Sequence, residues 1–478
     1  MQALLGILAP VFWGLVTLSA LVFVHEGGHF LAARACGVRV TEFFLGMPCR
    51  FNIHHVSRRI GTKFGITPIL LGGYAAICGM DPTDVGCASA VLSYVHRKGR
   101  ATVSDIARDL SVSEDDALEA CVLLLGWGSL APVYDESKGE GAHSKYYPST
   151  YAAMPRDAAG NTVYDGRAFD RAHATAQGEP WDPPMGEQAF FDAERSRTYL
   201  GKGFWKRALM LVAGIAVNII TGFLLLVVVY SAIGVTAPVD VNALGSVEAS
   251  SPAADAGIRA QDRIMSIDGV ATFTWTDILD QLQDAKAGQA VEVEVWRPHD
   301  DDDARAADEG ANLKDAAWLS SHGSSSSKTV TLNEEGKLGI EVSTRTVHLN
   351  PLDSCRIAVS YIAQTAQMVG SLLNPTHTME VLDNSTSIVG ISVMSSQAAA
   401  AGPATFLNFA ALISFSLGFM NLLPIPPLDG GKLLIEVVQA IGRRPVPLKV
   451  QNAISFVGVG LFLLLFVYML RMDILRFF

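Results

Sequence analysis

Cysteine and basic charge are both scarce in this chain, and each shortage narrows the class of protein. Six cysteines are spread over 478 residues without a Cys-x-x-Cys pair, so neither a disulfide framework nor a zinc ribbon is expected. Lysine and arginine number 36 against 47 aspartates and glutamates, and the net charge of −11 argues against nonspecific nucleic-acid binding by the whole chain. Residues 1–15 carry no lysine or arginine, so no secretory signal peptide is expected.

Long hydrophobic runs are what the chain does have. Half of its residues are hydrophobic, and the mean hydropathy is +0.29. Four segments are apolar enough, over a sufficient length, to be predicted as membrane-spanning helices. Their predicted bounds are 1–35, 204–234, 405–435 and 452–473. The sequence therefore predicts a polytopic α-helical membrane protein with four transmembrane helices.

Basic residues beside these segments predict the orientation. They cluster after the first segment, before the second, and between the third and fourth, whereas none lies between the second segment and Arg259. Because cytoplasmic loops are enriched in lysine and arginine, the loop 36–207 is expected in the cytoplasm. Both termini and residues 234–405 are then expected outside.

An H-E-x-x-H motif, His25-Glu26-Gly27-Gly28-His29, lies inside the first hydrophobic segment. On a helix His25 and His29 are one turn apart and point to the same side, so both imidazoles can bind one zinc ion. Glu26 can then act on a water bound to that zinc. The alternative is a chance match in a buried helix. Ionisable groups within a membrane span are costly, however, and this setting favours a functional site.

A third ligand is predicted in the stretch 421–431, Asn-Leu-Leu-Pro-Ile-Pro-Pro-Leu-Asp-Gly-Gly. Asp429 follows helix-breaking prolines at the end of an apolar segment. Irregular backbone at membrane depth is tolerated only where protein or a cavity surrounds it, so the carboxylate should face a cation. The alternative is a turn at the membrane surface in which Asp429 is solvated.

Together the two motifs resemble the site-2 protease family of intramembrane zinc metalloproteases, in the bacterial branch that cleaves membrane-anchored anti-sigma factors. The resemblance implies one zinc ion per chain, held by His25, His29 and Asp429, with Glu26 as the catalytic residue. Asn421 matches an asparagine with which the family holds the substrate backbone. A location in the bacterial plasma membrane is also implied.

Two further stretches resemble the family's substrate-binding parts. Gly214 and Asn218 resemble a G-P-x-x-N signature in which Ile215 replaces the proline, and Asn218 is expected to contact substrate. Residues 61–80, within the region 36–80, alternate apolar and small residues as in a membrane-reentrant β-hairpin. Gly72, Gly73 and Tyr74 are there expected to pair with a substrate strand. An ordinary cytoplasmic hairpin is the alternative.

Residues 251–258 and 262–269 resemble the pattern of bacterial protease PDZ domains, and the resemblance implies that residues 236–346 form an extracytoplasmic PDZ domain of the α+β class. Asp268-Gly269 predicts a hairpin turn, residues 275–284 a helix, and residues 291–296 and 329–332 strands. The acidic and serine-rich stretch 300–327 is predicted to be disordered. The domain either binds an extended peptide by strand addition or acts only as a steric plug. Residues 355–404 are expected to form an amphipathic helix on the outer membrane surface, followed by a loop.

Residues 81–200 are predicted to be a cytoplasmic insertion. Helices at 89–98, 103–110 and 113–126 and a strand at 130–134 predict a winged-helix-like module over 88–152, followed by a linker over 153–200. The third helix would be the recognition helix, but its first turns are acidic and repel phosphate. A cytoplasmic protein partner is therefore favoured, and no DNA binding is expected.

The favoured function is a zinc-dependent intramembrane endopeptidase that cleaves single-span substrates such as anti-sigma factors. One alternative is a non-catalytic receptor that senses peptides through the PDZ domain and signals through the winged-helix module. The complete set of three ligands and Glu26 favours the enzyme. A zinc transporter is a further alternative, but the chain lacks an additional row of intramembrane ligands.

Overall fold

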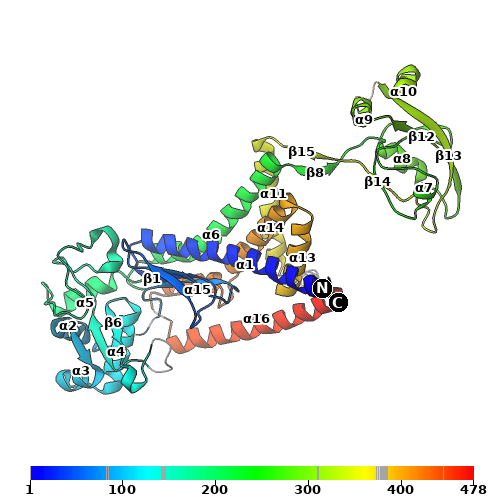
Figure 1. The fold of residues 1–478 in the computed structure, drawn as a ribbon. Coiled ribbons are helices and arrows are strands. Elements are labelled where there is room, and N and C mark those ends of the chain that lie inside the picture. Colours follow the sequence, from blue (N-terminus) through cyan, green and yellow to red (C-terminus); the bar gives the residue numbers. More distant parts are fainter. Residues whose placement is uncertain are drawn as a thin grey trace. The chain divides into compact units, whose positions relative to one another are not determined.

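The structure, a computed structural model, describes residues 2–81, 83, 85–141, 147–308, 312–372, 374, 376, 386–444 and 446–477. The chain divides into two compact units (Figure 1). One contains Met1–Val227 and Cys355–Phe478, and the other contains Val228–Ser354.

In the part of the chain that the structure describes, four helices carry stretches long and apolar enough to cross a membrane. These are α1 (Gln2–Ala35), α6 (Phe204–Val228), α14 (Pro403–Leu422) and α16 (Leu448–Phe477). The prediction of a polytopic membrane protein with four spanning helices is thereby confirmed. A short π-helix, Val229–Ile233, continues α6.

The predicted third span, 405–435, is too long. α14 ends at Leu422, and a separate helix, α15 (Asp429–Gly442), begins at the aspartate of the Leu-Asp-Gly motif. The prolines at 424, 426 and 427 explain the break, because proline has no backbone N–H to donate and disfavours helical geometry in the residue before it. The break places Asp429 in the first turn of a new helix.

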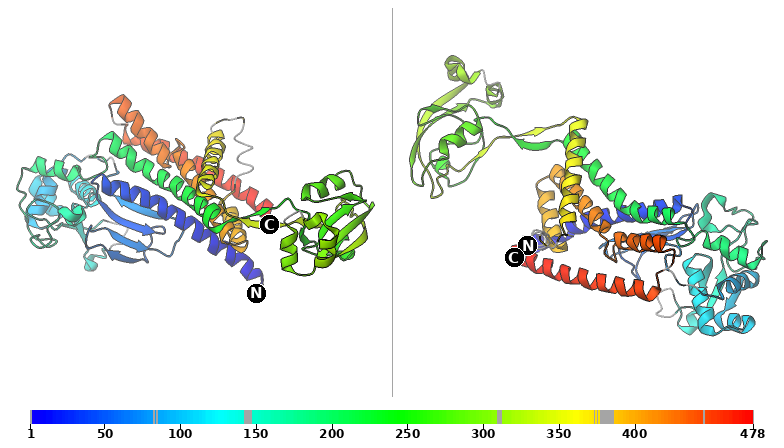
Figure 2. Two further views of the ribbon diagram at one scale, coloured as in Figure 1. Left: turned by 90° about the horizontal axis from the view of Figure 1, so that it is seen from above. Right: turned by 180° about the vertical axis from the view of Figure 1, so that it is seen from behind.

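A four-stranded sheet follows α1 and lies alongside it (Figure 2). Its strands are β1 (Val40–Leu45), β2 (Ile53–Val56), β3 (Lys63–Ile66) and β4 (Gly73–Ile77), in the spatial order β2-β3-β1-β4. β1 pairs with β3 in parallel and with β4 in antiparallel orientation. The predicted hairpin over 61–80 is therefore wrong, because β1 lies between β3 and β4.

The aromatic pair Phe43-Phe44 explains why β1 occupies the centre of this sheet. Phe43 packs against Phe23 and Phe30 of α1, while Phe44 stacks on Tyr74 on the opposite face, with ring centroids 5.3 Å apart. Alternate residues of a strand point to opposite faces, so β1 packs against α1 on one face and against the Tyr74 ring on the other. β4 is left as an edge strand.

Residues 355–404 were predicted as a surface helix with a loop. α11 (Pro351–Ser371) is the helix, but α13 (Ile388–Ala400) replaces the end of the predicted loop and packs along α1. Small residues allow this close approach, since a methyl group on Gly14 would overlap Ser392. Positions 373, 375 and 377–385 of the predicted segment lie outside the described residues.

Asp473, near the end of α16, is a buried carboxylate that fixes the start of α13. It accepts hydrogen bonds from the backbone N–H groups of Ser387 and Gly390, at 2.6 and 3.1 Å, and from the Thr386 hydroxyl. A carboxylate at a helix N-terminus satisfies backbone donors that have no partner within the helix. The last helix is thereby connected to the helix that packs on α1.

The insertion contains the predicted helices and strand. α2 (Ala88–Lys98), α3 (Val103–Leu110) and α4 (Glu114–Gly126) pack around one buried apolar cluster. Thr102 and Ser113 cap the N-termini of α3 and α4 with their hydroxyl oxygens.

The insertion also contains a three-stranded sheet with the order β5-β7-β6. Its strands are β5 (Arg100–Thr102), β6 (Leu130–Val133) and β7 (Thr150–Ala153). Short 3-10 helices occupy Glu136–Lys138 and Val163–Ala168.

The predicted linker over 153–200 is wrong, because this segment is packed around a buried group of ions. Glu194, on α5 (Glu187–Arg195), accepts hydrogen bonds from Arg39 and Arg156 at 2.7 to 3.0 Å. Arg39, just after α1, also pairs with Asp165 at 2.8 Å. The two buried guanidinium groups hold the pKa of the Glu194 carboxyl well below its ordinary value, against the effect of burial. The insertion is thus fixed to the end of α1 by ion pairs.

The second unit is built from short strands and helices. Its elements are β8 (Val235–Pro238), β9 (Leu244–Val247), α7 (Pro252–Asp255), β10 (Arg263–Ile267), β11 (Val270–Ala271), α8 (Trp275–Leu282), β12 (Ala290–Pro298), α9 (Asp301–Ala307), η4 (Asn312–Lys314), α10 (Ala316–His322), β13 (Gly323–Thr331), β14 (Ile340–Val342) and β15 (Thr344–Val347). One sheet has the order β11-β10-β12-β13, and two strand pairs, β14-β9 and β15-β8, complete the unit.

The stretch 300–327, predicted to be disordered, is ordered wherever the structure describes it. Trp296, Ala307 of α9 and Leu313 form one buried apolar cluster, which α10 also covers. The strand β13 begins at Gly323, inside the stretch. Arg263, itself buried, pairs with Asp308, which explains why an acidic segment packs here. Residues 309–311 lie outside the described part.

Candidate metal centre

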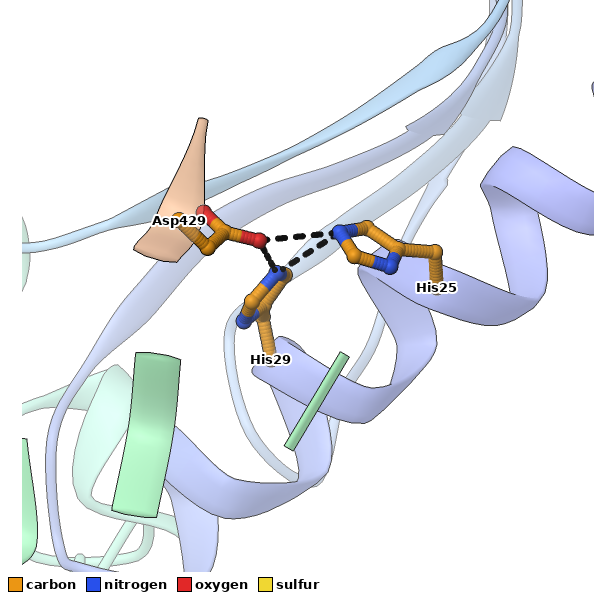
Figure 3. A group of neighbouring side chains, drawn as sticks. All are labelled: His25, His29 and Asp429. Carbon is orange, nitrogen blue, oxygen red and sulfur yellow. Dashed lines mark hydrogen bonds and ion pairs between the residues drawn. The ribbon is translucent and has the colours of Figure 1, made fainter. Parts of the chain in front are cut away.

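Two histidines of α1 and the first residue of α15 converge at one point (Figure 3). His25 Nε2 and His29 Nε2 lie 3.0 and 2.9 Å from Asp429 Oδ2, and 3.1 Å from each other. All three residues are buried. Ligand atoms of a tetrahedral zinc ion with bonds near 2.0–2.1 Å lie roughly 3.3 Å apart, so the three atoms are spaced to share one ion. Among the described residues, this is the one cluster of three or more such ligands.

The ring of His29 is oriented for metal binding through Nε2. Its Nδ1–H donates a hydrogen bond of 2.7 Å to the backbone carbonyl of Met210 on α6. Placing the proton on Nδ1 leaves the lone pair of Nε2 free for a cation. The sequence motif gives no indication of this contact, because Met210 participates through its backbone.

Asn218 lies beside His25, and its expected contact with substrate stays a prediction. The side chain is fully buried, and its Nδ2 lies 3.3 Å from His25 Nδ1. Its Oδ1 is buried without a hydrogen-bond partner. With the amide turned over, Oδ1 lies against His25 Nδ1–H and accepts its hydrogen bond. That pairing holds the proton of His25 on Nδ1 and leaves the lone pair of His25 Nε2 for a metal, so the surroundings fit zinc.

Two glycines permit the close packing of α1 and α6 at this site. A methyl group on Gly28 would come within 2.6 Å of the Ala213 carbonyl, and one on Gly214 would overlap the ring of His29. Helices that approach this closely require small residues at the contact. Gly27, by contrast, leaves room for a methyl group.

Glu26 is half-buried and lies next to the edge strand β4. A Cβ atom on Gly73 would lie 3.9 Å from Glu26 Cγ and 3.8 Å from Phe23 Cα. The structure therefore brings Gly73 to the residue predicted as the catalytic base. Tyr74 points to the other face of the sheet, where its hydroxyl donates to Glu42 at 2.8 Å. Gly72 lies next to Gly73 with a φ of 148°, which favours glycine.

Asn421 lies near the end of α14. Its Nδ2 donates a hydrogen bond of 2.9 Å to the carbonyl of Leu417, one turn earlier in the same helix. No contact between Asn421 and the three metal-ligand candidates is found among the described residues. Its role toward substrate stays a prediction.

Charged residues near Asp429 were not identified from the sequence as part of the site. Lys432 Nζ lies 3.6 Å from Asp429 Oδ1, one turn along α15. On the next turn, Glu436 pairs with Arg207 of α6 at 3.1 Å and accepts from the Tyr199 hydroxyl at 3.2 Å. The i, i+3 spacing of Asp429 and Lys432 was a usable signal. The contacts of Glu436 with Arg207 and Tyr199 could not be predicted from the sequence, because these residues are far from Glu436 along the chain.

Comparison with known proteins agrees with this geometry. The sequence matches the family described as Peptidase family M50 over residues 13–465. It is 26% identical over 465 residues to the Regulator of sigma-W protease RasP of Bacillus subtilis, covering 97% of this chain and 98% of the relative. It is 25% identical over 484 residues to the Zinc metalloprotease RasP of Geobacillus kaustophilus, covering 97% of this chain and 97% of the relative. It is 27% identical over 465 residues to the Zinc metalloprotease RasP of Shouchella clausii, covering 96% of this chain and 97% of the relative.

The family match includes both metal-ligand motifs, and the relatives align over almost their full length. The resemblance seen in the sequence is thereby confirmed. A shared zinc chemistry also agrees with the donor set formed by two imidazoles and one carboxylate. The chain belongs to peptidase family M50, the site-2 proteases, and it is a zinc metalloprotease.

Proposed function

We propose that this membrane metalloprotease holds one zinc ion between His25, His29 and Asp429 and cleaves the transmembrane segments of single-span proteins. The observation that carries the proposal is the convergence of these three side chains within 3.1 Å, on a membrane-spanning helix and beside an edge strand. A buried ligand set at this position serves a substrate that reaches the site through the membrane.

Within such a site, bound zinc supplies a Lewis acid that polarises a peptide carbonyl and lowers the pKa of water. Glu26 accepts the proton of the attacking water on a carboxylate oxygen and passes it to the leaving amine. His29 keeps its proton on Nδ1, bonded to Met210, and Asn218 orients His25. Asp429 contributes negative charge, and Lys432 faces its second oxygen.

β4 is the proposed docking strand for the substrate. A helix must unwind before hydrolysis because its carbonyls are held in internal hydrogen bonds, and an edge strand offers replacement bonds. β4 runs from Gly73, beside Glu26, to Ile77. A strand added here passes directly by the catalytic base. Gly72, Gly73 and Tyr74 are proposed to contact the substrate at this edge, and Asn421 is proposed to hold its backbone nearby.

The proposed substrate class is the single-span anti-sigma factor. One relative is named as a regulator of sigma-W protease, and that name describes the relative. The full-length similarity supports extending this class to the present chain. The proposed location is the bacterial plasma membrane, with residues 36–207 in the cytoplasm.

Residues 236–346 are proposed to act as an extracytoplasmic PDZ domain. The turn between β10 and β11 at Asp268-Gly269, the helix α8 and the strand β12 support this proposal, since these elements fall where the sequence pattern predicts them. Such a domain binds an extended peptide or excludes bulky ectodomains, and both actions limit which substrates reach the membrane site.

The insertion is proposed to bind protein in preference to DNA. The first turn of α4 carries Glu114, Asp115 and Asp116, all exposed. Negative charge at this position repels phosphate, whereas a recognition helix needs arginine or lysine there.

The decisive experiment is Glu26→Gln in the full-length protein. The wild type should cleave a single-span reporter in proteoliposomes, and the variant should not, although it should retain zinc, because an amide cannot take up the proton. Normal cleavage by the variant would remove Glu26 from the mechanism. Wild-type protein that binds zinc and cleaves no single-span protein would favour the alternative of a non-catalytic receptor.

A further inference from the structure

Two adjoining clefts separate the insertion from the metal-binding core. One, of about 610 Å³, is lined by Lys432 and Glu436 of α15 and by Arg207 of α6. The other, of about 440 Å³, is lined by Ile77 at the end of β4 and by α4 of the insertion. Both share the lining residues Met80, Asp81, Thr83, Leu123 and Trp127. The two clefts therefore adjoin, and together they are called the β4–α4 cleft, which comes within one helical turn of Asp429 at Lys432.

The α4 end of this cleft is acidic. Its described lining includes Asp81 and Glu119 and contains no lysine or arginine. Asp115 lies one turn before Glu119 on the same face of α4, and both side chains are exposed. This face continues through Val122, Leu123 and Gly126, which line the cleft. A row of carboxylates therefore leads from solvent into the space beside β4.

Cationic groups at the other end are largely compensated. Lys432 faces Asp429 and Arg207 pairs with Glu436, while Arg195 lies exposed at the rim. The cleft consequently changes from compensated charge near the metal centre to negative charge at α4. A ligand with positive charge at the α4 end fits this distribution.

We propose that the β4–α4 cleft binds the basic segment that flanks the cytoplasmic end of a substrate's transmembrane helix, with Glu119 and Asp115 as its charged contacts. This inference rests on the proposed function, because a substrate strand paired with β4 leaves that strand at Ile77, where the cleft begins. Cytoplasmic flanks of membrane spans are enriched in lysine and arginine. The insertion thus selects substrates by their flank.

Two observations disfavour a nucleic acid as the occupant. Leu123, in the C-terminal half of α4, and Trp127, the residue that follows α4, already face the cleft and are not free to enter a groove of DNA. The carboxylates at the start of α4 repel phosphate. The same features suit a flexible, basic polypeptide that lies along α4.

The solvent exposure of Glu119 determines how strongly its loss should affect the kinetic parameters. Ion pairs between exposed groups are weak, so loss of the Glu119 contact should raise KM about two- to fivefold. The flank takes no part in bond cleavage, so kcat should be unchanged. A structural defect in the insertion would instead reduce the response to every substrate, whatever its flank.

The test uses full-length enzyme in detergent with synthetic peptides that share one span of about 20 apolar residues. Their flanks are Lys-Arg-Lys, Gln-Gln-Gln or Glu-Glu-Glu, and detergent removes the effect of flank charge on membrane topology. Wild type should show the lowest KM for the basic flank. Glu119→Lys should lose this preference and favour the acidic flank. Glu114→Lys is the matched control, because it makes the same charge change on α4 away from the cleft-lining face.

Two outcomes of this peptide assay would overturn the proposal. One is equal KM values for the three peptides with the wild type, and the other is the same shift from Glu114→Lys as from Glu119→Lys. A gel-retardation assay tests the other ligand. If the wild type binds duplex DNA and the binding changes on substitution of Glu119, the cleft has another ligand and the proposal is overturned. Failure of the proposed function has a different signature, since the wild type would then cleave none of the three peptides.

Discussion

Gly214 of α6 lies directly against His29 of α1, so closely that a methyl group on Gly214 would overlap His29 Nε2. The same methyl group would come within 2.9 Å of His25 Cε1. Both contacts involve rings that are candidate metal ligands. The absence of a side chain at position 214 therefore gives the two imidazoles the space in which they meet Asp429.

Gly214→Ala should accordingly lose zinc affinity, by at least about tenfold, because the added methyl group must displace a ligand ring. Zinc content after dialysis against a graded chelator measures the effect. Gly460→Ala on α16 is the control, since a methyl group there meets no atom within 4 Å. Unchanged zinc affinity in Gly214→Ala would show that the rings bind in another position.

Asn218→Leu should weaken zinc binding about 10- to 100-fold, because it removes the acceptor that holds the proton on His25 Nδ1. Asn218→Asp retains an acceptor oxygen and should keep most of the affinity. Competition with a fluorescent zinc chelator compares the two variants. Equal losses in both would mean that the amide is needed for packing and does not orient the ring.

The insertion should become less stable as the pH falls. His96 donates through Nδ1 to Leu92 and accepts through Nε2 from Arg156, so it is held neutral. Burial, and then the neighbouring guanidinium, lower the pKa of His96 to about 3. An unfolded histidine titrates near 6.5, so the unfolded state binds the extra proton first and stability is lost below that pH. At pH 5 the loss should be about 2 kcal/mol.

Hydrogen exchange of the α2 amides at pH 7.5 and pH 5, corrected for intrinsic rates, measures this loss. His96→Gln is the comparison variant, because its side chain does not titrate, and its stability should change little over this range. The Glu194 carboxyl, whose pKa is also depressed, loses its contribution only at lower pH, below its ordinary value of 4.5. An equal loss in wild type and His96→Gln would assign the acid sensitivity to other groups.

Deletion of residues 236–346 should relax selection by ectodomain size and leave peptide-bond cleavage intact. None of the residues proposed for chemistry lies in this range. Reporters with long and with trimmed ectodomains should be cleaved at similar rates by the deleted enzyme, whereas the wild type should prefer the trimmed form. Continued refusal of the long reporter would place size selection elsewhere in the protein.

The convergence of His25, His29 and Asp429 at one point was predictable from the sequence because each motif carries local information. A histidine pair at i, i+4 fixes one face of a helix, and prolines before Asp429 fix the start of another. Four apolar spans were predictable for the same reason. Hydropathy depends on composition within a short window, not on distant partners.

Contacts between distant segments were not predictable. Glu194 resembles any exposed glutamate until Arg39 and Arg156 are placed beside it, and this explains why the segment 153–200 resembled a linker. Strand order in the sheet depended on which strand could pack aromatic rings on both faces. Asp473 ends an apolar helix as a membrane-surface residue would, and only the fold reveals the backbone donors that it binds.

His25 and Asp429 are separated by 404 positions along the chain. At ribosomal rates of about 5–20 residues per second, the third ligand appears roughly 20 to 80 s after the two histidines. During this interval the first helix is already synthesised with only part of its metal site. The two histidines therefore stand on the growing chain as an incomplete ligand set until those 404 further positions, Asp429 included, have been added.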